Sequence, residues 1–248
     1  MKVGVFDSGA GGLSVVKSLL KHKLFEEIIY YGDTARVPYG TKDKNTIIRY
    51  SLEALEFFNN FDIDLLITAC NTVSSYALNE MREASSYDIV GVIEPGIRAL
   101  ENKISDKNAS ILITGTRATI ASGRYQNELM ERGYHNLTAL QTGLFVPLVE
   151  EGIFSGPILE ETMHYYFRDI SNPDAVILGC THFPMISESM KAHFQNRPLM
   201  IHSGEAIVEY LGESCGITDR CAQSDLKIFA SDNVEGLRAI AKGWLGDF

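Results

Sequence analysis

Two short turns of the sequence each carry one cysteine in the same setting. The segments ITACNT (67–72) and ILGCTH (177–182) each pass from an apolar run to a cysteine and then to small polar residues that can open a helix. At such a place, backbone amides and the helix dipole stabilise a thiolate. One buried cysteine of this kind is most simply inert packing. Two in equivalent turns, Cys70 and Cys180, favour a chemical role.

Two opposed thiols could act as base and acid on the two faces of one carbon. If one starts as a thiolate and removes a proton while the other starts as a thiol and delivers one, the configuration at that carbon is inverted. His182, two residues after Cys180, could be a satisfied polar residue or the proton partner of that thiol. The residues alone therefore suggest a two-base racemase or epimerase, with no particular substrate.

Two further turns follow predicted strands. The first, DSGAGG (7–12), is rich in glycine but fits neither the dinucleotide nor the Walker pattern, so a nucleotide site is only weakly indicated. Its Asp7 could cap a helix, or orient an ammonium group or a thiol. The second turn is Thr114-Gly115-Thr116. Because ligands bind at the carboxyl ends of parallel strands, we expect all four turns to converge on one cleft.

The elements that position these turns follow from alternating patterns. Helical patterns separate short apolar runs, which is typical of parallel sheets covered by helices. Stripes such as Leu159, Met163 and Tyr166 are most simply core faces. The apolar runs are 2–7, 27–31, 63–69, 89–93, 110–114, 137–140, 174–179, 199–202 and 226–230.

The turns also repeat along the chain. Asp7 matches Thr114 at an offset of 107, and Cys70 matches Cys180 at an offset of 110. This near-constant spacing predicts two related halves: pseudo-symmetric α/β domains of doubly wound, flavodoxin-like parallel sheets with the site between them. A boundary near Glu94-Pro95-Gly96 predicts one domain from 1–93 plus 204–248 and another from 94–203.

Composition restricts the class of protein. The chain has 248 residues and a net charge of -10, which disfavours nucleic acid or an anionic membrane as partner. The carboxylate of Asp7 lies too close to the amino terminus for a signal peptide, and no apolar run is long enough to span a membrane. We therefore expect a cytoplasmic location. The four cysteines form no C-x-x-C pair and are expected to be thiols.

Seven ordered segments resemble the cofactor-independent bacterial glutamate racemases, which interconvert L- and D-glutamate for peptidoglycan synthesis. They are GVFDSGAGG (4–12), YYGDTARVPYG (30–40), ITACNT (67–72), GVIEPG (91–96), VPLVEEG (146–152), ILGCTHFP (177–184) and IHSGEAIVEYL (201–211). Any one of these segments alone would be weak evidence for the family, but seven in the same order are a specific match. The resemblance runs to the final helix.

The resemblance implies roles for individual residues. Cys70 and Cys180 are the implied acid and base, with Asp7 and His182 tuning them and Glu150 and Asp33 in support. Glu151 stands beside Glu150 and could be confused with it. The implied substrate-binding residues are Asp7, Ser8, Tyr39, Gly40, Asn71, Thr72, Thr114, Thr116, Thr119, Thr181 and His182.

The resemblance also implies glutamate as substrate, a homodimer, and two α/β domains around one cleft. No cofactor is expected, since hydroxyl and amide donors in a cleft that excludes water could stabilise the carbanion-like transition state. No metal-ligand cluster or cofactor motif stands out in the sequence.

Three alternatives stay open at this point. An aspartate racemase would share the two cysteines but offer a shorter pocket. A non-catalytic sensor of acidic amino acids would use the cleft without needing paired thiols. A redox switch would join Cys70 and Cys180 in a reversible disulfide.

Overall fold

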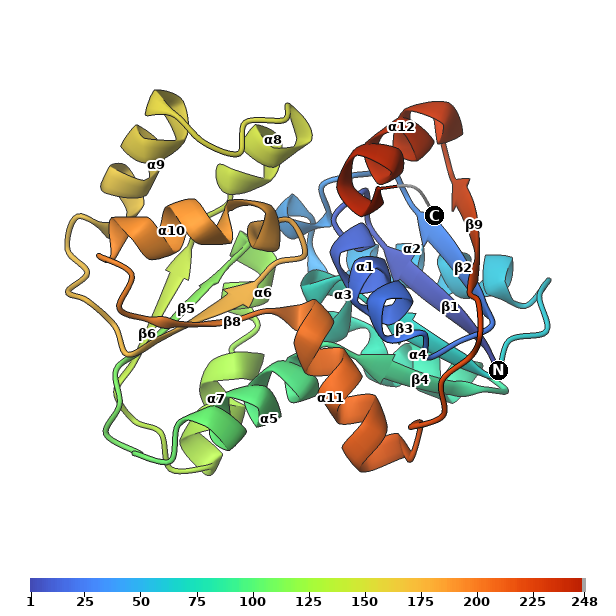
Figure 1. Ribbon diagram of the computed structural model, residues 1–248, viewed down its shortest axis with the longest axis horizontal. Coiled ribbons are helices and arrows are strands. Elements are labelled where there is room, and N and C mark those ends of the chain that lie inside the picture. Colours follow the sequence, from blue (N-terminus) through green and yellow to red (C-terminus); the bar gives the residue numbers. More distant parts are fainter. Residues whose placement is uncertain (247–248) are drawn as a thin grey trace.

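The chain forms two parallel β-sheets, each with helices on both faces (Figure 1). The structure is a computed structural model and describes residues 1–246. The first sheet contains β1 (Lys2–Asp7), β2 (Glu27–Gly32), β3 (Leu65–Thr68), β4 (Asp88–Gly91) and β9 (Asp225–Ala230). The second contains β5 (Ile111–Gly115), β6 (Leu137–Gln141), β7 (Ala175–Gly179) and β8 (Leu199–Ile201). The predicted fold of two parallel-sheet α/β halves is confirmed.

The two sheets share one strand order. The first runs β4-β3-β1-β2-β9 and the second, taken in the matching direction, β8-β7-β5-β6. β1 therefore corresponds to β5 and β3 to β7, which are the strands that precede the repeated turns. In each sheet the chain reverses its direction of travel between these two strands. This switch point is where open parallel sheets bind ligands.

Helices cover the faces of both sheets (Figure 1). The first half has α1 (Leu13–His22), α2 (Lys44–Phe58), α3 (Asn71–Tyr76), α4 (Leu78–Ala84), α12 (Val234–Leu245) and the short 3-10 helix η1 (Tyr39–Thr41). The second half has α5 (Ile93–Lys103), α6 (Arg117–Ala121), α7 (Arg124–Glu131), α8 (Phe145–Glu150), α9 (Pro157–Phe167), η2 (Phe183–Ile186) and α10 (Ser187–His193).

Each central strand is apolar on both sides because both sides are covered. In β1, Val3 and Val5 pack into one core cluster and Phe6 into another on the opposite face. The second sheet has the same arrangement, with Ile113 on one side and Leu112 on the other. This double burial explains why the strands read as continuous apolar runs rather than alternating ones.

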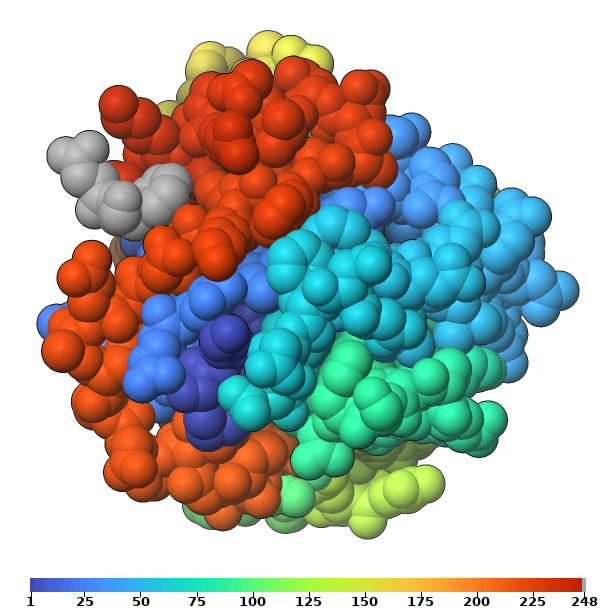
Figure 2. Space-filling model, turned by 90° about the vertical axis from the view of Figure 1, so that its right-hand side faces the viewer, coloured from blue at the N-terminus to red at the C-terminus, as the bar shows by residue number. Residues whose placement is uncertain are grey.

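The carboxyl-terminal segment returns to the first half. After helix α11 (Ser203–Cys215) ends at Gly216 in a left-handed conformation, β9 pairs in parallel with β2 and α12 packs beside it. Figure 2 shows this segment lying across the amino-terminal half of the molecule. Because α11 packs against α1 as well as α5, the predicted domain boundaries at 94 and 204 stay a prediction.

Within residues 1–246, the structure contains no helix whose length and apolar character would let it cross a membrane.

Candidate active site

The turns after β1, β3, β5 and β7 face a common cavity between the two halves. Its volume is about 20 Å³, which is room for about one water molecule. The lining comes from Ser8, Val37, Pro38, Tyr39, Gly40, Cys70, Asn71, Thr72, Thr116, Val146, Gly179, Cys180, Thr181 and His182. Residues from both halves therefore line one very small cavity.

Cys70 is the first-half thiol of this cavity. It stands at the N-cap of α3 and is 6% exposed. Burial, followed by the negative charge of Asp7, raises the pKa of Cys70 to about 12, although the amide of Val73 and the hydroxyl of Ser8 oppose this. The Sγ lies 3.6 Å from Ser8 Oγ. The surroundings of Cys70 therefore favour the protonated thiol.

Cys180 is the second-half thiol, and its partner is an imidazole. Its Sγ lies 3.6 Å from Nδ1 of His182, whose Nε2 lies 2.5 Å from Glu150 Oε1. Burial disfavours protonation of His182, but its hydrogen bonds with Cys180 and Glu150 outweigh that effect and raise its pKa well above the usual value. Cys180 therefore has an imidazole as its neighbour where Cys70 has a hydroxyl, so the surroundings of the two thiols differ.

Asp7 joins the two halves beneath the cavity. It is fully buried, with Oδ1 accepting a hydrogen bond from the Gly9 amide and Oδ2 accepting one of 3.1 Å from Thr181 Oγ1. Burial raises its pKa, opposed by the charge of His182 and by these hydrogen bonds. Ser14 on α1 adds a second link by donating to the Thr181 carbonyl.

Three of the predicted threonines form a cluster of hydroxyls across the interface. Thr72 lies 3.0 Å from Thr116 and 3.2 Å from Thr119, measured between the side-chain oxygens. Thr72 and Thr116 line the cavity. Thr114, although predicted to join them, donates instead to the Ile177 carbonyl of the adjacent strand and does not line the cavity.

Tyr39 and Asp33 form a buried pair at one side of the cavity. The Tyr39 hydroxyl donates to Asp33, and Arg36 Nε donates to the same carboxylate at 2.6 Å. Burial, the hydrogen bond to Asp33 and the Asp33 charge raise the pKa of Tyr39. Tyr39 lines the cavity, whereas Asp33 supports it from behind.

Two glycines allow the halves to approach this closely. A Cβ on Gly11 would lie 2.3 Å from Thr181 Oγ1 and 2.6 Å from His182 Nδ1. A Cβ on Gly40 would lie 2.4 Å from Thr116 Cβ. Both glycines belong to the first half and the three obstructing residues to the second, so the close approach of the halves depends on the absence of these side chains.

The model of one protein family, described as Asp/Glu/hydantoin racemase, matches residues 13–211. The chain belongs to this family. A glutamate racemase of a Nitratiruptor species is 60% identical over 247 residues, covering 100% of this chain and 97% of that protein. The crystal structure of glutamate racemase from Campylobacter jejuni subsp. jejuni superposes with a TM-score of 0.97 at 54% identity, covering 99% of this chain and 98% of that one.

A more distant member of the family was solved with a ligand. The crystal structure of glutamate racemase from Francisella tularensis subsp. tularensis, in complex with D-glutamate, has a TM-score of 0.86 and 31% identity, covering 99% of this chain and 94% of that one.

The sequence did not single out four residues that line the cavity. Val37 and Pro38 lie beside Tyr39, Val146 enters from α8, and Gly179 precedes Cys180. The segments VPYG, VPLVEEG and ILGCTHFP contain these residues, so adjacency to predicted site residues was the available signal. Tyr125 lies outside the lining but donates a hydrogen bond to Asn71, and it follows no recognisable pattern in the sequence.

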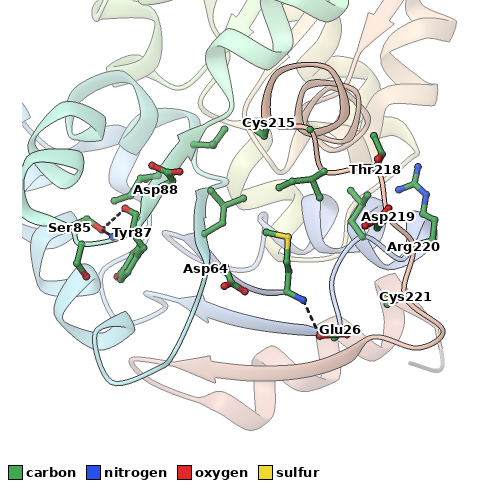
Figure 3. A pocket seen from close by; sticks show the side chains of 18 of the residues that line it. Glu26, Asp64, Ser85, Tyr87, Asp88, Cys215, Thr218, Asp219, Arg220 and Cys221 are labelled. Atoms are coloured by element: carbon green, nitrogen blue, oxygen red, sulfur yellow. Dashed lines mark hydrogen bonds and ion pairs between the residues drawn. The ribbon is translucent and has the colours of Figure 1, made fainter.

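A larger cavity lies away from the two cysteine turns, among Glu26, Asp64, Tyr87 and Cys215 (Figure 3). Its volume is about 910 Å³. Several of its polar groups are already paired: Glu26 with the amino terminus, Asp64 with the Lys2 amide, and Ser85 with Tyr87. The groups expected to do chemistry lie instead in the small cavity between the halves.

Proposed function

We propose that the protein is a glutamate racemase that interconverts L- and D-glutamate with two cysteines. The observation that carries this proposal is the placement of Cys70 and Cys180, one from each half, on the lining of one cavity. Both are free thiols. The similarity to full-length glutamate racemases, one of them solved with D-glutamate, supports glutamate as the substrate.

Proton transfer follows from the different surroundings of the thiols. In one direction the Cys180 thiolate, with the proton held on His182, takes the α-proton, so a Cα–H bond breaks and an S–H bond forms. The Cys70 thiol then delivers its proton to the opposite face, breaking S–H and forming the new Cα–H bond. In the reverse direction the roles exchange. The raised pKa of Cys70 suits it to begin as the acid.

The remaining lining residues suit an amino acid with two carboxylates. Ser8, Thr72, Thr116 and Thr181 supply hydroxyls, and Asn71 an amide, around the two sulfurs. Donors fixed in a site without bulk water stabilise negative charge that develops on the α-carboxylate as the proton leaves. We assign Asp7 and His182 to tuning the thiols, Glu150 to holding His182, and Tyr39 and Gly40 to the substrate wall.

The small volume of the cavity implies a step before chemistry. Space for about one water cannot hold glutamate, so the halves must separate to admit it. Contacts that would break include the hydrogen bonds of Thr181 with Asp7 and Ser14. Closure then removes solvent from the reacting groups.

The biological setting is part of the same proposal. We place the enzyme in the cytoplasm as a homodimer that supplies D-glutamate for peptidoglycan synthesis. We also propose that residues 1–93 with 204–248, and residues 94–203, act as the two bodies that separate. Light scattering in solution tests the dimer.

Incubation with L-glutamate in deuterated water tests the reaction. We expect deuterium at the α-carbon together with loss of optical activity, and the absence of both in folded, reduced protein would refute the assignment. L-aspartate in the same assay tests the alternative of an aspartate racemase, whose substrate has a shorter side chain.

The two-base mechanism is tested by Cys70→Ser and Cys180→Ser, each of which should abolish racemisation without unfolding the protein. Cys215→Ser is the matched control, because that exposed thiol lies outside the cavity. Full activity in either cavity variant would contradict the two-cysteine scheme.

A further inference from the structure

The side-chain amide of Asn71 is paired at one end only. Its Oδ1 accepts a 2.7 Å hydrogen bond from the Tyr125 hydroxyl, whereas its buried Nδ2 has no hydrogen-bond partner within residues 1–246. Asn71 follows Cys70, lines the cavity and is 2% exposed. A buried donor without a partner costs free energy of folding. The protein leaves this donor unpaired at the place where the substrate is expected.

The hydrogen bond to Oδ1 comes from the other half of the molecule. Tyr125 lies on α7, and its ring is buried in the core cluster that also contains Ile97 and Leu129. Asn71 begins α3 of the first half. Tyr125 does not line the cavity, so any effect it has on the substrate passes through Asn71.

The Tyr125 hydroxyl keeps its proton. Burial, with smaller contributions from the charges of Glu128 and Cys180, raises the pKa of Tyr125. The hydroxyl therefore remains a donor at the pH values where the thiols exchange protons, and its hydrogen points at the Asn71 oxygen.

The orientation of this amide matters because its two ends have opposite chemistry. The oxygen and nitrogen of an asparagine are nearly equal in size, and a half-turn exchanges them. Nitrogen facing the cavity would bind a carboxylate, whereas oxygen would repel it. A donor fixed against Oδ1 selects the first of these two states.

We propose that Tyr125 is a positioning residue that holds the Asn71 amide with Nδ2 toward the cavity, where it binds a carboxylate of the substrate. This inference rests on the proposed function, since glutamate supplies the carboxylate. Asn71 would contact the substrate directly, and Tyr125 would set which end of the amide the substrate meets.

Tyr125→Phe removes only the hydroxyl. Its matched control is Tyr134→Phe, because Tyr134 is equally buried in the same core cluster and its hydroxyl donates to the Ile104 carbonyl, away from the cavity. We expect Tyr125→Phe to lower kcat/KM about tenfold, the scale of one hydrogen bond to a charged group, mainly by raising KM. Tyr134→Phe should leave both kinetic constants unchanged.

A double-mutant cycle separates positioning from a general structural effect. Asn71→Ala should raise KM by itself, and adding Tyr125→Phe to it should cause no further loss. Independent losses that multiply, or an unchanged KM in Tyr125→Phe, would overturn the proposal. Wild-type protein that does not racemise glutamate would instead refute the proposed function.

A structure of the wild-type protein with D-glutamate decides the matter if Tyr125→Phe does not fold. The proposal requires Asn71 Nδ2 within hydrogen-bonding distance of a substrate carboxylate while Tyr125 stays on Oδ1. A carboxylate bound by the Tyr125 hydroxyl itself, or no contact between Asn71 and the substrate, would overturn it.

Discussion

Gly11→Ala tests whether catalysis depends on the close approach of the two halves. Gly11 lies in the first turn, and its backbone is outside the left-handed region, so alanine is conformationally allowed there. The added Cβ would nevertheless meet Thr181 Oγ1 at 2.3 Å and His182 Nδ1 at 2.6 Å. We therefore expect each half of the variant to fold normally and the added methyl group to oppose their closure.

The expected loss follows from these distances. Non-bonded heavy atoms prefer separations of about 3.5 Å or more, so Thr181 and His182 must retreat by about 1 Å. The displaced Nδ1 of His182 is itself the partner of the Cys180 sulfur. A misplacement of about 1 Å can reduce the rate of a positioned reaction about 100-fold. We expect kcat/KM to fall by about that factor.

Circular dichroism at a wavelength where glutamate absorbs follows racemisation from either enantiomer. Because the two enantiomers are equal in free energy, kcat/KM must fall by the same factor in both directions. Gly212→Ala is the control, since a Cβ on this α11 glycine meets no atom of the described residues 1–246 within 4 Å. Wild-type kcat/KM in Gly11→Ala, with the protein folded, would refute the requirement for closure.

Three further predictions concern pH and stability. Glu150→Gln removes a charge beside His182 and should lower the His182 pKa, so the alkaline decline of kcat/KM should move to lower pH; an unchanged profile would separate Glu150 from the reaction. The raised pKa of His182 means that its pairing stabilises the fold fully below about pH 6.5 and that this stability is lost as the pH rises through the raised value. The difference in free energy of unfolding between wild type and His182→Gln should therefore shrink in alkali, and a difference that grows would contradict the sign. Asn233 caps α12 by accepting from the Gly236 amide and has a left-handed backbone, so urea titration should show a loss of about 2 kcal/mol for Asn233→Ala. Asn233→Gly should lose less, because glycine adopts this backbone without strain.

The strands were the most predictable part of the fold. Each of the nine apolar runs overlaps a strand of the structure, because burial on both faces leaves an unbroken apolar signal. The run at 137–140 formed β6, but this strand lies at a sheet edge and is largely half-buried or exposed. In α9, the predicted stripe residues Leu159 and Met163 are fully buried, but Tyr166 is only half-buried and Phe167 beside it is buried instead. Periodicity identified this helix but left its rotation uncertain by about one residue.

The candidate site was predictable where chemistry coincides with a strand end. Cys70 and Cys180 share a local sequence pattern, and the internal repeat alone predicts that they occupy equivalent turns. Tyr125 could not be found in this way, because it reaches Asn71 through the packing of α7 against the rest of the second half. Thr114 shows the converse: it stands near a strand end, but its hydroxyl is taken by the Ile177 carbonyl.

The return of the chain to its first sheet affects how the protein can be synthesised. β9 covers the edge of β2, whose Ile28 and Tyr30 are fully buried, yet residues 225–230 are made after the entire second half. During translation, the second half can therefore complete its sheet while the first still has an open edge. An unpaired strand edge is a site for mispairing with other chains. The second half can therefore fold as soon as it has been synthesised, whereas the first half acquires its edge strand β9 only after residues 225–230 have been made.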